Sequence, residues 1–395
     1  MVEGWKKDKL TNIIAQITTG KLDANAMVPN GEYRFYTCAK DYCYIDSYAF
    51  DDEALLISGN GEYVGYIHYY NGKFNAYQRV YVLTGFKINV KYLENYLNRY
   101  LPIRINKEVS QNNIPYIRLS TLSKMDVLFP ESLSEQASIA NILSSVDEAI
   151  ESVKKSIEAA EKLKKSLMQN LLTGRMKPDG IFRTEEEFYE DEKFGKVPIG
   201  WDVKAIGDKK VCQINPVYKY KRKEIYDFVP MEAVKERFGG LDYVEKQLID
   251  NGSYTRFKAG DILFAKITPC SENGKVAYIE HIDSEVGFAS TEFIVFHPTD
   301  EVDGHYIYLL LTSENIHRLA ISLMEGTTGR QRIPWKIFKN RIFVQMPGKE
   351  EQTSIVNKIL IFDKQINNYN NRIITLKSLK KSLMQNLLTG KVRVK

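Results

Sequence analysis

Two aspartates and a lysine form a pattern in this sequence that matches a catalytic set. Pro178-Asp179 is followed by Asp191-Glu192-Lys193, the order in which metal-dependent nucleases gather two carboxylates and a lysine around Mg²⁺. That chemistry needs a rigid β-hairpin, whereas these residues lie in a polar stretch, so we expect no metal site there. The five histidines and four cysteines have no metal-ligand spacing either, which argues against a zinc site and for reduced, structural thiols.

Two further patterns could serve nucleotide chemistry but are incomplete. Gly59-Asn60-Gly61 follows a strand-like run, yet its third glycine is Gly65, one position late for a dinucleotide-binding loop, and the chain continues as a strand. No helix N-terminus is therefore available for a pyrophosphate. Asn215-Pro216-Val217-Tyr218 is similar to the Asn-Pro-Pro-Tyr of amino-methyltransferases, but it lacks the second proline and a preceding glycine-rich strand. We interpret it as a turn.

Side chains of the types that read base edges in DNA occur in predicted turns beside aromatic residues. Arg, Lys, Asn and Gln make bidentate hydrogen bonds to bases, and a turn exposes them to a ligand. Each of these side chains could instead have a purely structural role. For example, Tyr77 could belong to the core and Arg79 could form a salt bridge. The candidates are Asn75, Tyr77, Gln78, Arg79, Lys266, Asn273, Lys275, Arg330, Gln331 and Arg332.

An internal repeat determines which elements position these side chains. The residues Leu163–Gly174 (LKKSLMQNLLTG) recur unchanged at Leu379–Gly390, an offset of 216 residues. The same offset places Glu135-Gln136 opposite Glu351-Gln352. The sequence therefore predicts a tandem duplication in which a variable globular part precedes a shared segment. A fainter similarity joins the starts of the halves, at residues 4–5 and 200–201, which are both Gly-Trp.

The shared segment has the apolar period of a long helix. Ser132 and Glu135 form a capping box at the first helix start, and Thr-Gly pairs end both helices. Seams of about 39 residues correspond to about 58 Å of helix. Such matching apolar stripes along two helices are most simply explained if the helices pack on each other. The alternative is that the two are unrelated surface helices. The heptad seam consists of Ile139, Leu143, Val146, Ile150, Val153, Ile157, Ile355, Ile359, Phe362, Ile366, Tyr369 and Ile373.

The variable parts contain short β-rich runs separated by glycine turns. Asn71-Gly72 and Asn273-Gly274 are predicted as turns. The polar stretch 177–197 carries seven acidic and four basic residues and is predicted as a linker. The lysine pairs at 164–165 and 380–381 are interpreted as solvated helix faces. The predicted strands are 54–58, 64–70, 78–83, 261–267, 275–279 and 293–296.

Composition narrows the class of protein. The chain of 395 residues is 44% hydrophobic and 27% charged, which is typical of soluble globular domains and excludes a disordered chain. No run approaches the roughly 18 apolar residues of a spanning helix, and the first ten residues lack a signal region, so we expect a cytoplasmic protein without a membrane partner. The net charge is only +5. DNA binding would therefore come from local patches.

The duplicated organisation resembles the specificity subunit of type I restriction-modification systems over nearly the whole chain. The resemblance is carried by Glu-Gln at the start of each shared helix and by Ser-Leu-Met-Gln-Asn-Leu-Leu-Thr-Gly at its end. Motifs similar to the target-recognition domains of that family add Lys21, Lys73 and Thr268 to the candidate DNA-binding residues. These motifs lie at residues 19–26, 72–79, 264–270, 272–275 and 290–293.

The resemblance implies a fold and its division. The expected fold is α+β, with two target-recognition domains separated by two long antiparallel coiled-coil helices in a pseudo-twofold, circular arrangement. The expected boundaries are recognition domain 1 at 1–130, a central helix at 131–176, a linker at 177–199, recognition domain 2 at 200–345 and a C-terminal helix at 346–395.

The resemblance also implies a function without catalysis. The subunit would read a bipartite site on double-stranded DNA, one half per domain, and hold two modification subunits, to which restriction subunits add. We expect no cofactor or metal on this chain, with S-adenosylmethionine, ATP and Mg²⁺ on the partner subunits only. An adaptor protein with a dimerising coiled coil is the alternative, and a steep salt dependence of DNA binding would separate the two. An autonomous nuclease or methyltransferase is argued against, because the methyltransferase-like motif is incomplete and the nuclease-like pattern lies in a polar stretch.

Overall fold

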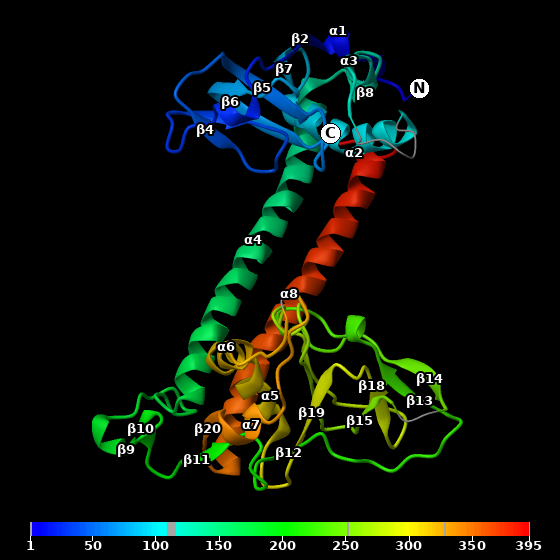
Figure 1. The fold of residues 1–395 in the computed structure, drawn as a ribbon. Coiled ribbons are helices and arrows are strands. Elements are labelled where there is room, and N and C mark those ends of the chain that lie inside the picture. Colours follow the sequence, from blue (N-terminus) through cyan, green and yellow to red (C-terminus); the bar gives the residue numbers. More distant parts are fainter. Residues whose placement is uncertain (1, 109–115, 251–252, 328, 395) are drawn as a thin grey trace. The chain divides into compact units, whose positions relative to one another are not determined.

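The computed structural model describes residues 2–108, 116–250, 253–327 and 329–394 and divides into two compact units. Unit 1 comprises Met1–Ser156 and Tyr369–Lys395, and unit 2 comprises Ile157–Asn368. The long helices α4 (Leu133–Leu172) and α8 (Lys349–Leu387) each contribute one segment to either unit (Figure 1). Each unit therefore combines one globular domain with helix segments from both copies of the repeat.

Domain 1, in unit 1, is built on a six-stranded sheet with the order β2-β7-β5-β6-β3-β4. Neighbouring strands are antiparallel, except that β3 and β6 run parallel, and a separate pair joins β1 to β8. The elements before α4 are β1 (Trp5–Lys9), α1 (Leu10–Ile13), β2 (Ile14–Thr19), β3 (Tyr33–Tyr36), β4 (Cys43–Ile45), β5 (Phe50–Ser58), β6 (Ile67–Ala76), β7 (Val80–Phe86), α2 (Val90–Glu108), α3 (Leu119–Ser123) and β8 (Asp126–Pro130).

The central strands of domain 1 are buried on both faces because successive side chains point to opposite sides of a strand. On β5, Leu55 and Ile57 pack in one cluster with Leu97 of α2. Ala54 and Leu56 pack in a second cluster on the other face. The continuous apolar run in the sequence is thus the signature of a strand covered on both sides.

Domain 2, in unit 2, repeats this core with its strands divided between two sheets. Its first sheet has the order β12-β19-β16-β17, all antiparallel, and β11 pairs with β20. By position in the sheet, these four strands correspond to β2, β7, β5 and β6. The second sheet has the order β14-β13-β18-β15, in which β13 pairs antiparallel with β14 and parallel with β18, as β3 does with β4 and β6 in domain 1. The elements are β11 (Asp202–Ala205), β12 (Cys212–Ile214), β13 (Glu224–Val229), β14 (Glu245–Ile249), β15 (Thr255–Phe257), β16 (Ile262–Ala265), β17 (Val276–Tyr278), β18 (Gly287–Ala289), β19 (Phe293–Pro298), α5 (Gly304–Thr312), α6 (Glu314–Ser322), α7 (Ile337–Asn340) and β20 (Phe343–Met346).

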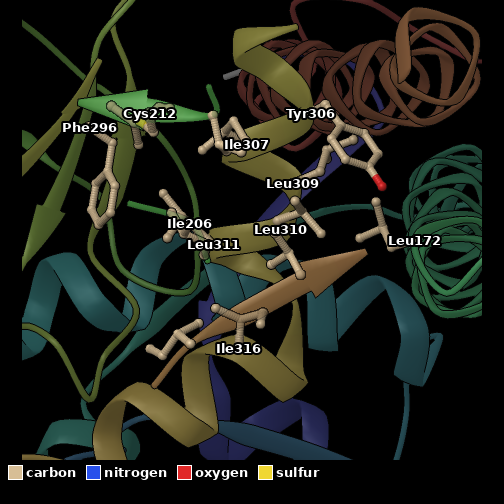
Figure 2. Packing of buried hydrophobic residues seen from close by; sticks show 14 of the residues in the cluster. Leu172, Ile206, Cys212, Phe296, Tyr306, Ile307, Leu309, Leu310, Leu311 and Ile316 are labelled. Atoms are coloured by element: carbon tan, nitrogen blue, oxygen red, sulfur yellow. The ribbon is translucent and has the colours of Figure 1, made fainter. Parts of the chain in front are cut away.

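The largest core of unit 2 surrounds the apolar helix α5. Figure 2 shows Leu310 and Tyr306 of α5 near Leu172 at the end of α4. The hydroxyl of the fully buried Tyr306 donates to the carbonyl of Gln345 at 3.2 Å. Burial raises the pKa of Tyr306, so this hydroxyl stays protonated and remains a hydrogen-bond donor.

Two sequence predictions about turns and linkers are corrected. Asn71-Gly72 is not a hairpin turn, because β6 continues through both residues and Gly72 pairs with Asp52 of β5. Gly72 has a φ of 131°, which glycine tolerates and other residues do not. The segment predicted as a linker, 177–199, contains the hairpin β9 (Phe188–Asp191) and β10 (Gly195–Pro198). It is a folded part of unit 2.

The glutamines of the repeated Glu-Gln pairs tie each long helix to a domain. The side-chain amide of Gln136 donates to the carbonyl of Pro130 (2.7 Å) and accepts the backbone N–H of Asn89 (2.7 Å). Gln352 makes the same pair of bonds in unit 2, at 2.8 Å to a proline carbonyl and at 2.9 Å from the N–H of Asp303. Both glutamines are buried, so water does not compete for these groups.

The glutamates of the same pairs hold the chain beyond the end of the other long helix. In unit 1, Glu135 accepts two hydrogen bonds from Arg393, at 2.6 and 2.8 Å. The guanidinium lowers the pKa of Glu135. In unit 2, Glu351 accepts one from Arg183 at 2.6 Å and one from the indole N–H of Trp201 at 3.0 Å. The same sequence motif thus makes the same kind of joint in each unit.

Two ion pairs join the helix segments farther along. Asp147 binds Lys380 at 2.7 Å in unit 1, and Asp363 binds Lys164 at 2.5 Å in unit 2. Within each unit, the contacts move forward along one helix as they move backward along the other, so the segments run antiparallel. The predicted solvated faces at 164 and 380 are corrected, because both lysines are ion-paired.

Each long helix is followed by a glycine that packs close to a tryptophan. Gly174 and Gly390 have φ angles of 64° and 69°, the left-handed conformation that ends helices. A Cβ on Gly174 would lie 3.2 Å from Trp201, and one on Gly390 would lie 3.1 Å from Trp5. The repeated Gly-Trp at the start of each half is therefore explained by contact with the end of a long helix.

The predicted seam is buried unevenly. Its first positions in each helix, Ile139, Leu143, Ile355 and Ile359, belong to the domain cores. These residues stabilise the attachment of each helix to a domain as well as any contact between helices. Farther along, Val146, Ile150 and Val153 are buried, whereas the remaining positions are half-buried: Ile157, Phe362, Ile366, Tyr369 and Ile373.

Replacing Gln352 with leucine should destabilise unit 2. The substitution leaves the N–H of Asp303 and the proline carbonyl without partners, and a buried unsatisfied group costs about 1–3 kcal/mol. We expect the free energy of unfolding to fall by about 1–3 kcal/mol in urea denaturation followed by circular dichroism. Gln385→Leu, at an exposed position of the same helix, should change it by less than about 0.5 kcal/mol. Equal stability of the two variants would show that the amide is dispensable.

Candidate nucleic-acid interface

Domain 1 has a surface groove of about 330 Å³ at one edge of its sheet, named groove 1 here. It lies where β2 and β5 end and where β7 begins. The segment before α3 forms the remaining wall. The lining residues are Thr19, Gly59, Asn60, Gln78, Arg79, Tyr81, Tyr116 and Ile117.

Backbone hydrogen bonds fix the walls of groove 1. The N–H of Gly59 donates to the carbonyl of Arg79 (2.9 Å), and the N–H of Ile117 donates to the carbonyl of Gly59 (2.7 Å). The hydroxyl of Tyr81 adds a bond to the carbonyl of Ile117 at 3.0 Å. A Cβ on Gly59 would lie 2.3 Å from the carbonyl oxygen of Arg79, so this close approach requires glycine.

Domain 2 has a surface groove of about 270 Å³, named groove 2. It lies where β12 and β16 end and where β19 begins, the positions that correspond to those of groove 1. The second sheet adds a wall through β15. The lining residues are Asn215, Pro216, Val217, Tyr254, Thr255, Arg256, Lys266 and Phe293.

The backbone beside groove 2 repeats the hydrogen bonds of groove 1. The N–H of Lys266 donates to the carbonyl of Glu292 (2.9 Å), and the N–H of Ile333 donates to the carbonyl of Lys266 (2.8 Å). Ile333 follows Ile117 by 216 residues, the offset of the repeat. The two grooves are therefore the same feature of the shared core, with different side chains on equivalent backbone positions.

Both grooves combine cationic and amide side chains. Among the described residues that line them, every charged side chain is basic: Arg79 in groove 1, and Arg256 and Lys266 in groove 2. Such groups donate hydrogen bonds to phosphate oxygens and to base edges. Amides are supplied by Asn60, Gln78 and Asn215.

The cations of groove 2 are held by their own domain. Arg256 donates to the carbonyl of Tyr218 at 2.8 Å, and its guanidinium lies 4.5 Å from the ring centre of Tyr220. The ammonium of Lys266 donates to the carbonyl of Thr291 at 2.7 Å. These contacts restrict the side chains, so less conformational entropy is lost when they bind a ligand.

The candidates of domain 1 divide between the groove and other sites. Gln78 and Arg79 are exposed in groove 1. Lys21 is exposed just after β2. Lys73, on β6, places its ammonium 4.6 Å from the centre of a tyrosine ring and is not among the lining residues. Tyr77 is half-buried against the core. Gln78 and Arg79 are therefore the strongest candidates of domain 1.

A base-reading role for Asn75 is contradicted by its position. Its side chain is buried, with 4% of the residue exposed. The amide donates to the carbonyl of Ser47 (3.1 Å), and its oxygen accepts the N–H of Ala76 (2.9 Å). Sequence reasoning placed Asn75 in a turn, whereas β6 extends to Ala76 and buries it.

Two candidates of domain 2 serve the domain's own structure. The ammonium of Lys275 donates to the carbonyl of Met231 at 3.0 Å, and the amide of Asn273 donates to the carboxylate of Glu236 at 2.8 Å. Both contacts attach the segment after β13 to the turn at Asn273. Neither residue lines groove 2, so the predicted ligand role of Asn273 and Lys275 is replaced by a structural one.

The remaining candidates of domain 2 gather beside groove 2. Lys266 lines the groove, and the segment carrying Arg330, Gln331 and Arg332 pairs with the chain after β16. The backbone N–H of Gln331 donates to the hydroxyl of Thr268 at 3.2 Å. Arg330 and Arg332 are exposed. The structure thus brings together residues that are far apart in the sequence.

Sequence reasoning missed several lining residues. The sequence indicates Asn60 only as part of a glycine turn. Asn215 was considered only in the methyltransferase-like tetrapeptide, and it does form a turn, with a φ of 49°. Arg256 could not be identified as a lining residue from the sequence, because the strand that carries it was not predicted. An amide residue in a turn just after the predicted strand 54–58 is the signal that could have identified Asn60.

The nuclease-like pattern is used to cap turns. The carboxylate of Asp179 accepts the N–H of Ile181 at 2.9 Å. That of Asp191 accepts the N–H groups of Lys193 (2.8 Å) and Phe194 (3.0 Å). The described residues contain no group of three or more His, Cys, Asp or Glu that could hold a metal ion.

Comparison with known proteins assigns the chain to a family. The type I restriction modification DNA specificity domain matches residues 2–162 and 198–378, and the chain belongs to this family. The specificity subunit of the type I restriction enzyme EcoDI from Escherichia coli is 40% identical over 177 residues, 44% of this chain and 38% of that protein. The MjaVIII subunit of Methanocaldococcus jannaschii is 24% identical over 297 residues, 74% of this chain and 68% of that one.

The chain matches well under half the length of these Escherichia coli relatives. The EcoEI subunit is 34% identical over 171 residues, which are 42% of this chain and 28% of that protein.

Solved structures extend the fold comparison. The S subunit from M. genitalium superposes with a TM-score of 0.57 at 16% identity, covering 97% of this chain and 96% of that one. A chain from a study of complex assembly and conformational transition of the type I R-M system gives 0.54 at 12% identity, covering 98% of both.

These likenesses confirm the family and the α+β fold with tandem recognition domains and long helices that the sequence predicted. In the described part of the chain, every helix is too short or too polar to cross a membrane.

Asn75→Ala should destabilise domain 1. The substitution leaves the carbonyl of Ser47 and the N–H of Ala76 without partners, and we expect the free energy of unfolding to fall by about 1–3 kcal/mol in urea denaturation. Gln78→Ala, three residues away and exposed, should change it by less than about 0.5 kcal/mol. If Asn75→Ala were as stable as the unsubstituted protein, the side chain would not have the structural role assigned here.

Proposed function

We propose that the protein is the DNA-specificity subunit of a type I restriction-modification complex and that grooves 1 and 2 each contact one half of a bipartite site on double-stranded DNA. The observation that carries the proposal is the pair of equivalent grooves, lined by basic and amide side chains, in a chain of the specificity family. This family membership also favours DNA recognition over the adaptor interpretation.

The charge of the chain fits recognition by local contacts. With a net charge of only +5, no broad positive field draws DNA to the protein. Arg79, Arg256 and Lys266 concentrate positive charge in the grooves, where phosphate contacts position the duplex and amides select bases. Affinity should therefore fall as the salt concentration rises, since each phosphate that these side chains neutralise releases counterions.

The chemistry of the complex belongs to partner subunits in this proposal. Two modification subunits would transfer methyl groups from S-adenosylmethionine, and restriction subunits would cleave DNA with ATP and Mg²⁺. This chain would contribute only recognition and assembly. Its capped turns at Asp179 and Asp191 support that division, because the carboxylates of the nuclease-like pattern already accept backbone hydrogen bonds.

Arg79→Ala should change the reading of one half-site only. Loss of a base contact costs about 1–3 kcal/mol at the contacted position, while domain 2 keeps its own contacts. The test is sequencing of the DNA selected from a random pool by the complex of this chain with its modification subunits. We expect relaxed selection at one position of one half-site.

Lys6→Ala provides the control, because Lys6 is exposed on β1 and does not line the groove. It should leave both half-sites unchanged. If Arg79→Ala weakened the affinity for all DNA sequences equally, Arg79 would be a phosphate contact and not a base contact. Failure of the unsubstituted complex to select any sequence would contradict the proposed function.

A further inference from the structure

Arg332 and Glu292 form a two-point ion pair beside groove 2. The Nε of Arg332 donates to the carboxylate of Glu292 at 3.0 Å, and Nη2 donates to it at 2.8 Å. The Arg332 side chain remains 47% exposed, and that of Glu292 is 25% exposed. The guanidinium is therefore held along one edge while the rest of the group reaches solvent.

The ion pair leaves a defined part of the guanidinium available. An arginine can present two adjacent N–H groups either from Nε and Nη2 or from the two Nη atoms. Glu292 takes the first edge, and within the described residues no hydrogen bond engages Nη1. The second edge has the geometry of the paired donors that arginine offers to O6 and N7 of guanine.

Backbone contacts fix Arg332 at the groove. Arg332 forms a β-bridge with Ile267, and its neighbour Ile333 donates to the carbonyl of Lys266, a lining residue. Glu292 directly precedes Phe293, which also lines the groove. Both partners of the ion pair are thus attached to the same short hydrogen-bonded array that forms the groove wall.

The local charge also favours a nucleic-acid ligand. Arg332 lowers the pKa of Glu292, and Lys266 adds to the effect, so the carboxylate stays ionised at neutral pH. Two cations surround this one carboxylate, which leaves a net positive charge. Glu292 therefore orients Arg332 without cancelling the attraction of the site for DNA.

We propose that Arg332 reads a guanine in the DNA half-site bound by domain 2 and that Glu292 is the residue that positions its guanidinium. The inference rests on the proposed function and deepens it. Arginine held along one edge loses little entropy when the other edge binds, so the pair acts as a preformed reader in the major groove.

The same backbone positions in domain 1 carry different side chains. Arg79 takes the place of Glu292, because the backbone carbonyl of each accepts a hydrogen bond from the N–H of the residue directly after β5 or β16. Tyr116 takes the place of Arg332, since each precedes the isoleucine of the array. A glutamate-held arginine is therefore absent from these positions in domain 1, and the two domains should select different half-sites.

The test compares variants of Arg332 in the complete complex with modification subunits, by sequencing the DNA selected from a random pool and by measuring affinity against salt concentration. Arg332→Ala should abolish preference for guanine at one position of one half-site, a loss of about 5- to 100-fold in discrimination. Arg332→Lys keeps the charge without the paired donors, so it should lose the same preference while retaining the salt slope.

Glu292→Gln should reduce the guanine preference at that same position, because the orienting charge is removed. Arg318→Ala is the matched control, since Arg318 also pairs with a glutamate in domain 2 but on α6, away from the groove lining. It should leave the selected sequence unchanged.

The remaining outcomes distinguish a failure of this inference from a failure of the proposed function. Unchanged selection by Arg332→Ala, or an equal loss on all sequences, would overturn the assignment of Arg332 while the bipartite recognition stands. A guanine preference retained by Arg332→Lys would overturn the paired-donor reading. Absence of any selected sequence with the unsubstituted complex would overturn the proposed function itself.

Discussion

The repeated Glu-Gln pair at the start of each long helix is the interaction on which the structure depends. The buried glutamine satisfies two backbone groups of a domain, and the neighbouring glutamate binds an arginine beyond the end of the other helix. A lost partner at a buried amide is costly, so substitutions there should be poorly tolerated. Each unit therefore contains one domain and parts of both helices, and the joint is made twice from one motif.

On this shared attachment, the domains keep one groove and vary its side chains. The strands that end or begin at groove 1 correspond to those at groove 2, and the same two backbone hydrogen bonds shape both. What differs is the side chain on equivalent positions, such as Tyr116 against Arg332, and the separate strand β15 that supplies Arg256 in domain 2. Recognition can thus diverge without changing the joints, because the grooves and the joints use different residues.

The sequence predicted the features that have a period or a repeat. The long helices, the central strands and the helix-ending glycines all follow from local patterns that fix burial. The prediction that Asn75 reads bases was wrong because the burial of Asn75 depends on how far β6 extends. The prediction of a turn at Gly72 was wrong because a glycine within a strand has the same local signal as a glycine in a turn. Arg256 could not be found, since only the folded second sheet brings it to Lys266. The pairing of Arg332 with Glu292 likewise joins residues 40 positions apart.

Exchange of one recognition domain tests most directly whether two separate readers act on a common scaffold. Residues 200–345 would be replaced by the equivalent part of a related specificity subunit, and the methylated sites would be mapped by sequencing DNA modified by the complete complex. The account predicts that one half-site changes to that of the donor and that the other is retained. A change in both half-sites, or in neither, would contradict independent reading by the two domains.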